Sequence, residues 1–252
     1  MRHLNRPAPP VELTQEVIDT KKAIYMADND QAVWKETYIE NALLSMSHDK
    51  CCYCECSIKE ESKYMEIDHF HDRHDYPDEV MDWNNLLPSC KKCNGTKGTY
   101  DTVTSPIIDP SVDFPQNHLS LYNGVRFRNK DDKGFQTIIA LDLNNQDRHC
   151  TPRYMIVKEI NSKMESFHHS SEEFIKGLRV ITPQGVGRLR NNVLELMQKG
   201  DDDKVYCSIA ASAILNDPIY PLLKSNLQSL SSWTQEMEEL ESKMLSYKFD
   251  VA

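Results

Sequence analysis

Apolar residues at helical spacing organise the first fifty residues of the chain. The segments TQEVIDTKKAIYMA and DQAVWKETYIENALLSMSH, residues 14–27 and 30–48, have the length and periodicity of helices. Asp30 is the predicted N-cap of the second segment, which would place Ile39, Leu43 and Met46 on one face. We therefore expect a helical region over residues 1–50.

The same spacing returns from residue 151 to residue 252. Thr151-Pro152 is typical of a helix start, and apolar residues follow at helical positions, at Ile156, Ile160, Met164 and Phe167. Ser232 and Gln235 resemble a capping box ahead of a last apolar stripe. Such stripes usually serve packing, so this region is predicted to be helical; it either completes the fold or offers a docking surface to a partner.

Alternating patterns between these helical regions predict strands. HLSLY and VRFR are joined by Asn123-Gly124, the strongest short hairpin signal, and FQTIIALDL offers a third strand. Residues 105–150 are therefore expected to form a small antiparallel sheet. Together with the helices, this predicts an α+β fold.

Composition narrows the class of protein. The 252 residues are 39% apolar and 27% charged, which is typical of a soluble globular chain of one large or two small domains. No apolar run is long enough for a signal peptide or a membrane span, so a cytoplasmic location is expected. The net charge of -10 argues against a protein that grips phosphate backbones with its whole surface.

Cysteines concentrate in one part of the chain, residues 51–104. CCYCEC begins this part, and two CxxC knuckles can be formed, by Cys51, Cys54, Cys90 and Cys93. Two such knuckles can offer four thiolates to a tetrahedral Zn²⁺ at about 2.3 Å, and four cysteines leave no open position for catalysis. The spacing therefore predicts a structural zinc site. Cys52 and Cys56 leave the register of the first knuckle open.

Polar residues with catalytic chemistry lie between and just after the knuckles. Asp68-His69 ends the predicted strand YMEIDHF, Asn85 precedes the second knuckle, and Asn94 and Lys97 follow it. Phosphodiester cleavage needs a base near neutral pH, and imidazole, with a pKa of about 6.5, is suited to that task. A carboxylate and an amide oxygen suit a divalent cation that neutralises the leaving oxygen.

The order of these residues resembles the HNH endonuclease family, whose ββα-metal motif reads CxxC, DH, NL, CxxC, then H or N, and KG. The resemblance covers residues 51–98 and implies that His69 is the general base, with Asp68 and Asn94 as ligands of a catalytic Mg²⁺ or Mn²⁺. It also implies that Asn85 fixes the loop that holds His69. Asn94 stands where many members have His.

Several neighbours of the motif have open roles. Glu66 should share the face of Asp68 on an extended strand and could approach the cation. Lysine and arginine side chains could form a strip for the substrate backbone, at Arg73, Lys91, Lys92 and Lys97. His71 and His74 could contact phosphate or a second metal, or belong to a solvated loop. Cys150 and Cys207 are most simply buried apolar residues.

A weaker resemblance extends over the whole chain. MRHLNRPAPPVEL, EIDHFHDR and IIALDLNNQDRHCTPR resemble the HNH partner proteins, of the PtuB type, found in Septu and retron-Septu anti-phage systems. This resemblance implies an effector nuclease that acts on DNA or tRNA together with a PtuA-like ATPase. In some systems a retron reverse transcriptase and its msDNA or noncoding RNA also take part. A zinc-stabilised, non-catalytic scaffold and a stand-alone restriction-type nuclease are the competing functions.

Overall fold

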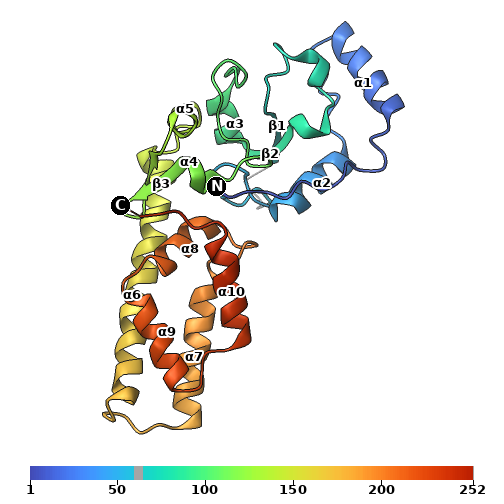
Figure 1. The fold of residues 1–252 in the computed structure, drawn as a ribbon. Helices are drawn as coiled ribbons and strands as arrows, with labels where there is room; N and C mark the ends of the chain where they lie inside the picture. Colours follow the sequence, from blue (N-terminus) through green and yellow to red (C-terminus); the bar gives the residue numbers. More distant parts are fainter. Residues whose placement is uncertain (60–64, 252) are drawn as a thin grey trace. The chain divides into compact units, whose positions relative to one another are not determined.

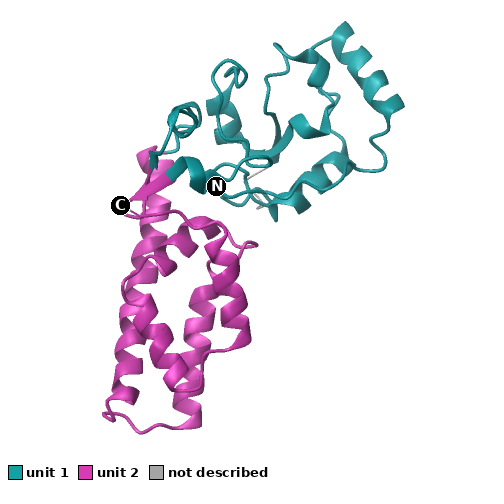
Figure 2. Cartoon of the chain, in the orientation of Figure 1, with its two compact units in different colours: residues 1–119, 128–143 teal, residues 120–127, 144–252 magenta. Residues whose placement is uncertain are grey.

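The computed structural model describes residues 1–59 and 65–251, and its chain divides into two compact units. Unit 1 comprises residues 1–119 and 128–143, and unit 2 comprises residues 120–127 and 144–252 (Figure 2). The fold is α+β, as the patterning predicts, with helices and short antiparallel strand pairs. None of the described helices combines the length and apolarity needed to cross a membrane.

Unit 1 contains a ββα arrangement preceded by two helices (Figure 1). The two helices are α1 (Gln15–Ala27) and α2 (Thr37–Ser47), and the ββα elements are β1 (Met65–His69), β2 (Leu86–Cys90) and α3 (Lys91–Lys97). The strands pair antiparallel, from Met65 opposite Cys90 to His69 opposite Leu86, and α3 contacts both. β1 confirms the predicted strand, although Tyr64 of that segment lies outside the described residues. Short 3₁₀ turns at Pro77–Glu79 and Trp83–Asn85 connect the strands.

The first helix matches its prediction and the second is shorter than predicted. Thr14 caps α1 by accepting a hydrogen bond from the backbone of Val17. α2 begins at Thr37 rather than near Asp30, because the intervening residues form turns that direct Trp34 into the core of unit 1. The predicted apolar face is buried, at Ile39, Leu43 and Met46.

The predicted hairpin is present, but the predicted third strand is wrong. β3 (Leu119–Tyr122) and β4 (Arg126–Asn129) pair across Asn123 and Gly124, which adopt φ values of 50° and 69°, as a type I′ turn requires. Residues 132–140 form helix α5 (Asp132–Ala140) instead of a strand. Asp131 caps this helix through the backbone of Gly134, and a helix start with such a cap outweighs a short apolar run. A four-residue helix, α4 (Pro115–His118), precedes the hairpin.

Unit 2 is helical. Its elements are α6 (Thr151–Ile175), α7 (Pro183–Gln198), α8 (Cys207–Leu215), α9 (Tyr220–Ser229) and α10 (Gln235–Leu245), which pack side by side in Figure 1. Their apolar stripes meet in one core, which confirms the predicted buried positions Ile160 and Met164. Two starts differ from prediction. A π-helical turn, Gln146–Cys150, precedes Thr151, and α10 is capped by Thr234 rather than Ser232.

Candidate metal centre and active site

Four thiols from the two CxxC knuckles come together in unit 1. The sulfur atoms of Cys51, Cys54, Cys90 and Cys93 lie within 4.8 Å of one another, and all but Cys90 are buried. The first knuckle is a turn closed by the backbone N–H of Cys51, which donates to the carbonyl of Cys56 at 2.9 Å. The second opens α3, where the thiol of Cys90 accepts from the backbone of Cys93 at 3.4 Å. These four residues could hold a metal ion.

Cys52 and Cys56 stand outside this group of four. Cys52 is buried, and its backbone N–H donates to the carbonyl of Pro88 on β2 at 2.9 Å. Cys56 is half-buried, and its thiol interacts with those of Cys54 and Cys90. The backbone bond of Cys52 therefore fastens the first knuckle to β2, while Cys56 lies at the edge of the cluster.

Asp68 is a buried carboxylate with a partner for each oxygen. The hydroxyl of Tyr53 donates to Oδ2 at 2.5 Å, and the ammonium of Lys97 donates to Oδ1 at 3.0 Å. Asp68 is only 2% exposed, and this burial raises the pKa of its carboxyl, opposed by the charge of Lys97 and by the hydrogen bond from Tyr53. Lys97 also donates to the carbonyl of His69 at 2.6 Å, so it joins both residues of the motif.

His69 is held as a neutral imidazole with one free acceptor. Its Nε2 lies 3.0 Å from the carbonyl oxygen of Val80, which can only accept, so Nε2 carries the proton. Among the described residues, Nδ1 has no hydrogen-bond partner. The ring packs at 89° to Trp34, with centroids 4.6 Å apart, and burial lowers the pKa of His69 to about 4. Nδ1 therefore carries an unpartnered lone pair, on an atom that is itself buried.

Asn85 ties together the loop that follows His69. Its Oδ1 accepts from the backbone of His71 at 2.7 Å, and its Nδ2 donates to the carbonyl oxygens of His71 at 3.1 Å and of Glu79 at 3.4 Å. Glu79 directly precedes Val80, whose carbonyl orients His69. The side chain of His71 is occupied by Glu79, with Nδ1 and Oε2 2.6 Å apart. Asn85 thus holds the loop that contains Val80, and the carbonyl oxygen of Val80 orients the imidazole of His69.

Glu66 and Asn94 meet across β1 and α3. The amide nitrogen of Asn94 donates to Oε2 of Glu66 at 2.8 Å, and both side chains are half-buried. That bond uses the nitrogen of Asn94 and leaves its oxygen as the atom that would bind a cation. Each oxygen of Asp68 can accept a second interaction besides its present one. Asp68, Asn94 and Glu66 are thus oxygen donors of the kind that a hard divalent cation takes.

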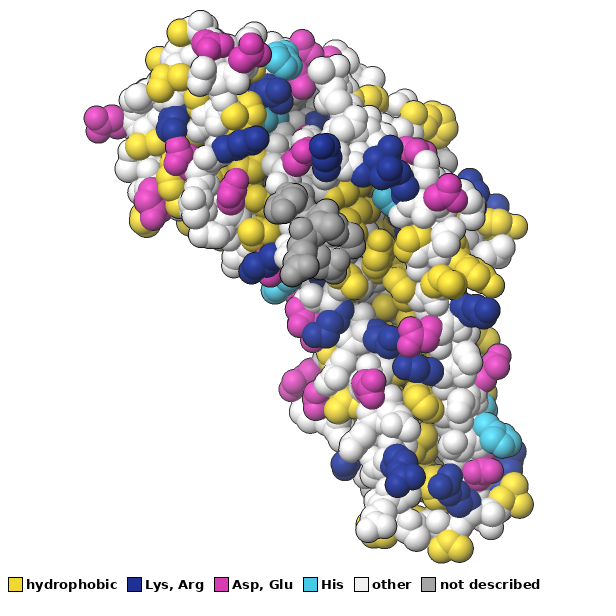
Figure 3. Space-filling view, turned by 180° about the vertical axis from the view of Figure 1, so that it is seen from behind, with side chains coloured by type: hydrophobic (Ala, Val, Ile, Leu, Met, Phe, Trp, Pro, Cys, Tyr) yellow, Lys and Arg dark blue, Asp and Glu magenta, His cyan; other side chains and the backbone are white. Residues whose placement is uncertain are grey.

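The basic residues near the motif differ in accessibility. Lys97, expected as a possible substrate contact, is 3% exposed and makes its bonds inside the protein. The guanidinium of Arg73 lies 4.9 Å from the centre of the Trp34 ring, and Lys91 and Lys92 are exposed on α3. On the face shown in Figure 3, basic side chains alternate with acidic ones rather than forming a continuous basic field.

Two side chains of this region were not predicted from the sequence. Tyr53 lies inside the first knuckle and Trp34 inside a segment expected to be helical. An aromatic residue between two ligand cysteines was a usable signal for Tyr53, because a buried hydroxyl needs a partner. Nothing in the spacing of Trp34 indicates that it packs against His69.

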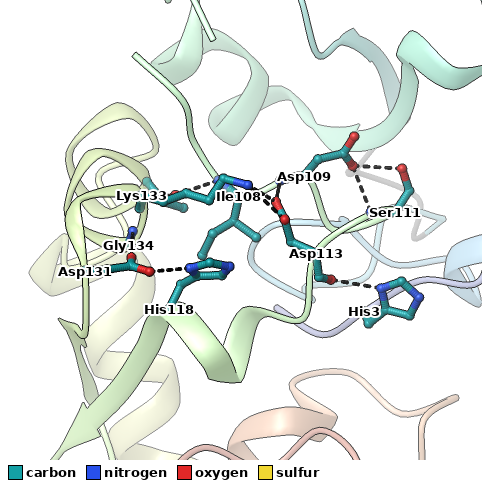
Figure 4. Close-up of polar contacts among 10 residues, drawn as sticks. His3, Ile108, Asp109, Ser111, Asp113, His118, Asp131, Lys133 and Gly134 are labelled. Atoms are coloured by element: carbon teal, nitrogen blue, oxygen red, sulfur yellow. Dashed lines mark hydrogen bonds and ion pairs between the residues drawn. The ribbon is translucent and has the colours of Figure 1, made fainter. Parts of the chain in front are cut away.

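A hollow of about 440 Å³ lies beside the loop that Asn85 fixes, and acidic residues line part of it. Figure 4 shows how these acids are satisfied within the protein. Asp113 binds Lys133 at 2.7 and 2.8 Å and accepts from the backbone of Asp109, whose own carboxylate accepts from Ser111. Asp109 and Asp113 therefore stabilise the fold and are not free to act as ligands.

Comparison with known proteins places the chain in a family. No family model matches the chain. The chain is 37% identical over 246 residues to the Septu protein PtuB of Bacillus thuringiensis. The aligned region covers 96% of this chain and 93% of that protein. It is also 27% identical over 162 residues to the Septu protein PtuB of Bacillus mycoides (strain KBAB4), or 52% of this chain and 54% of that protein. The chain therefore belongs to the PtuB family of Septu proteins.

Proposed function

We propose that this protein is a metal-dependent HNH endonuclease that hydrolyses phosphodiester bonds as the effector of a Septu anti-phage complex. The observation that carries this proposal is the state of His69. A backbone carbonyl holds the proton on Nε2, the other nitrogen is left as an acceptor, and a carboxylate precedes it in sequence. A buried nitrogen without a hydrogen-bond partner calls for an explanation, and we propose that it serves as a proton acceptor.

The proposed chemistry assigns a separate task to each group. Nδ1 of His69 takes the proton of the attacking water, and the carbonyl of Val80 keeps the ring oriented for that transfer. Asn85 keeps Val80 in place through its bonds to the loop. A Mg²⁺ or Mn²⁺ held by Asp68 and Asn94 would supply positive charge at the leaving oxygen.

The four cysteines have a structural task in this proposal. A Zn²⁺ bound by Cys51, Cys54, Cys90 and Cys93 would join the first knuckle to the junction of β2 and α3. Both strands of the ββα arrangement are only five residues long, and an isolated pair of such strands is only marginally stable without a further cross-link. Zinc would therefore contribute to folding and not to the cleavage step.

The acidic balance of the chain supports a role inside a complex. The net charge is -10, and the face in Figure 3 carries mixed charges instead of a basic field that would recruit nucleic acid without help. We propose that a PtuA-like ATPase positions it on DNA or tRNA. In a retron form of the system, a reverse transcriptase and its msDNA or noncoding RNA would join the complex.

A non-catalytic scaffold is the second candidate, favoured by one observation. Asp68 is almost fully buried, and both its oxygens already accept bonds, from Tyr53 and Lys97. If these bonds serve the fold alone, the Asp68-His69 pair needs no cation. The two candidates differ in whether His69 is required for defence.

The test is a phage challenge of cells that express this chain with its ATPase partner. Wild type is compared with His69→Ala and with His169→Ala, a control on the exposed surface of α6. We expect protection and newly cleaved nucleic acid with wild type and His169→Ala, and neither with His69→Ala, although its zinc content is unchanged. Equal protection by all three proteins would leave the scaffold as the function.

A further inference from the structure

Tyr53 is a buried side chain between two of the four clustered cysteines. It occupies the second position between Cys51 and Cys54, and it is 0% exposed. Its hydroxyl reaches Oδ2 of Asp68 at 2.5 Å, across to β1. A residue of the metal-binding turn therefore touches a carboxylate of the candidate active site directly.

The backbone of the knuckle gives this contact a fixed geometry. The N–H of Cys51 donates to Cys56, that of Glu55 donates to Cys51, and that of Cys52 donates to Pro88 on β2. The turn is thus closed on itself and anchored to the strand that pairs with β1. The ring of Tyr53 has little freedom to follow Asp68 if that carboxylate moves.

Beyond Asp68, the contacts continue to His69. The second carboxylate oxygen binds the ammonium of Lys97, which also donates to the carbonyl of His69. Tyr53, Asp68, Lys97 and the His69 peptide therefore form one continuous chain of hydrogen bonds. Each side chain in it is 4% exposed or less, so water cannot readily replace a missing partner.

We propose that Tyr53 is a positioning residue that fixes the carboxylate of Asp68 to the cysteine centre, so that the metal-bound turn sets the orientation of the active-site ligand. This inference rests on the proposed function, because it names what holds the ligand of the proposed cation. A purely structural tyrosine would fill the same space, but its hydroxyl would not matter to cation binding.

The decisive variant is Tyr53→Phe, which removes the hydroxyl and keeps the ring. Tyr25→Phe is the matched control, because Tyr25 is 2% exposed and its hydroxyl donates to a backbone carbonyl, that of Arg73. Zinc per full-length chain is measured first, to verify that the cysteine centre is filled. The affinity of the zinc-loaded proteins for Mn²⁺ is then measured by the loss of the free Mn²⁺ signal in electron paramagnetic resonance.

We expect wild type, Tyr25→Phe and Tyr53→Phe to hold the same zinc, and Tyr53→Phe to bind Mn²⁺ about tenfold more weakly, as loss of one charge-assisted hydrogen bond implies. In an Asp68→Asn background, Tyr53→Phe should have little further effect, because both changes act at one carboxylate. Cleavage by the complex should fall with Mn²⁺ affinity.

Equal Mn²⁺ affinity of wild type and Tyr53→Phe would overturn the inference and leave the proposed nuclease intact. A tenfold loss that persists in the Asp68→Asn background would also overturn it, because Tyr53 would then act elsewhere. Absence of Mn²⁺ binding by wild type would instead contradict the cation of the proposed function, and this inference with it.

Discussion

Replacing Lys97 by Met should destabilise unit 1 by about 3 kcal/mol. The ammonium of Lys97 donates to Oδ1 of Asp68 at 3.0 Å and to the carbonyl of His69 at 2.6 Å. The two side chains are 1% and 3% exposed, so the pair is buried on both sides. Loss of one partner of a buried ion pair costs about 3 to 5 kcal/mol, because the other charge is left uncompensated.

We place the expected value at the lower end of that range. Asp68 keeps the hydrogen bond from Tyr53, and Met fills much of the space of the lysine stem. The assay is urea unfolding of the zinc-loaded protein, followed by tryptophan fluorescence in a Trp233→Phe background. The signal then comes from Trp34 and Trp83, both in unit 1. At a typical urea dependence of about 1 to 3 kcal/mol per molar, the midpoint should fall by roughly 1 to 3 M.

Two comparisons make this prediction specific. Lys92→Met removes an exposed lysine from the same helix and should change the free energy of unfolding by no more than about 0.5 kcal/mol. Adding Asp68→Asn to Lys97→Met should recover about half of the loss, since the unpaired charge is then absent. If Lys97→Met is no more destabilising than Lys92→Met, the buried network described above does not stabilise the fold.

Two further predictions concern the metal and the backbone. Cys90→Ser should abolish the binding of one zinc per chain, measured by elemental analysis, whereas Cys150→Ser, which lies in unit 2, should retain it; equal zinc contents would exclude the proposed centre. Gly134→Ala should destabilise unit 1 by about 2 kcal/mol in urea unfolding, because the new Cβ would lie 2.1 Å from the carbonyl oxygen of His118. Gly187→Ala, inside α7 with open space around it, should stabilise unit 2 by about 0.5 to 1 kcal/mol, and destabilisation there would contradict this reading of the helix.

The sequence predicted the elements that local signals define. The Asn123-Gly124 turn depends on two adjacent residues, and each CxxC knuckle depends on a spacing of three residues. α5 was missed because its apolar run is short enough for either a strand or a helix, and the cap at Asp131 decides between them. The start of α2 was predicted too early because the sequence pattern does not show that Trp34 is buried in the core.

In the candidate site, too, some features could be predicted from the sequence and others could not. The identity of Asp68 and His69 as a pair could be read from a motif, but their partners come from distant parts of the chain. Tyr53 and Lys97 reach Asp68 from 15 and 29 residues away, and the carbonyl of Val80 that orients His69 belongs to no motif. Burial and hydrogen bonding of this kind depend on the assembled fold, so the sequence could not assign Lys97 to an internal bond.

The most direct test of the proposed nuclease is cleavage by the purified, zinc-loaded chain reconstituted with the proposed PtuA-like ATPase. Labelled DNA and tRNA are incubated with Mg²⁺ and wild type, His69→Ala or the control His169→Ala, and the initial rate of strand cleavage is measured. We expect wild type and His169→Ala to cut at equal rates and His69→Ala to be slower by about 100-fold or more, because it lacks the general base. Cleavage by His69→Ala at the rate of wild type would contradict the proposed nuclease.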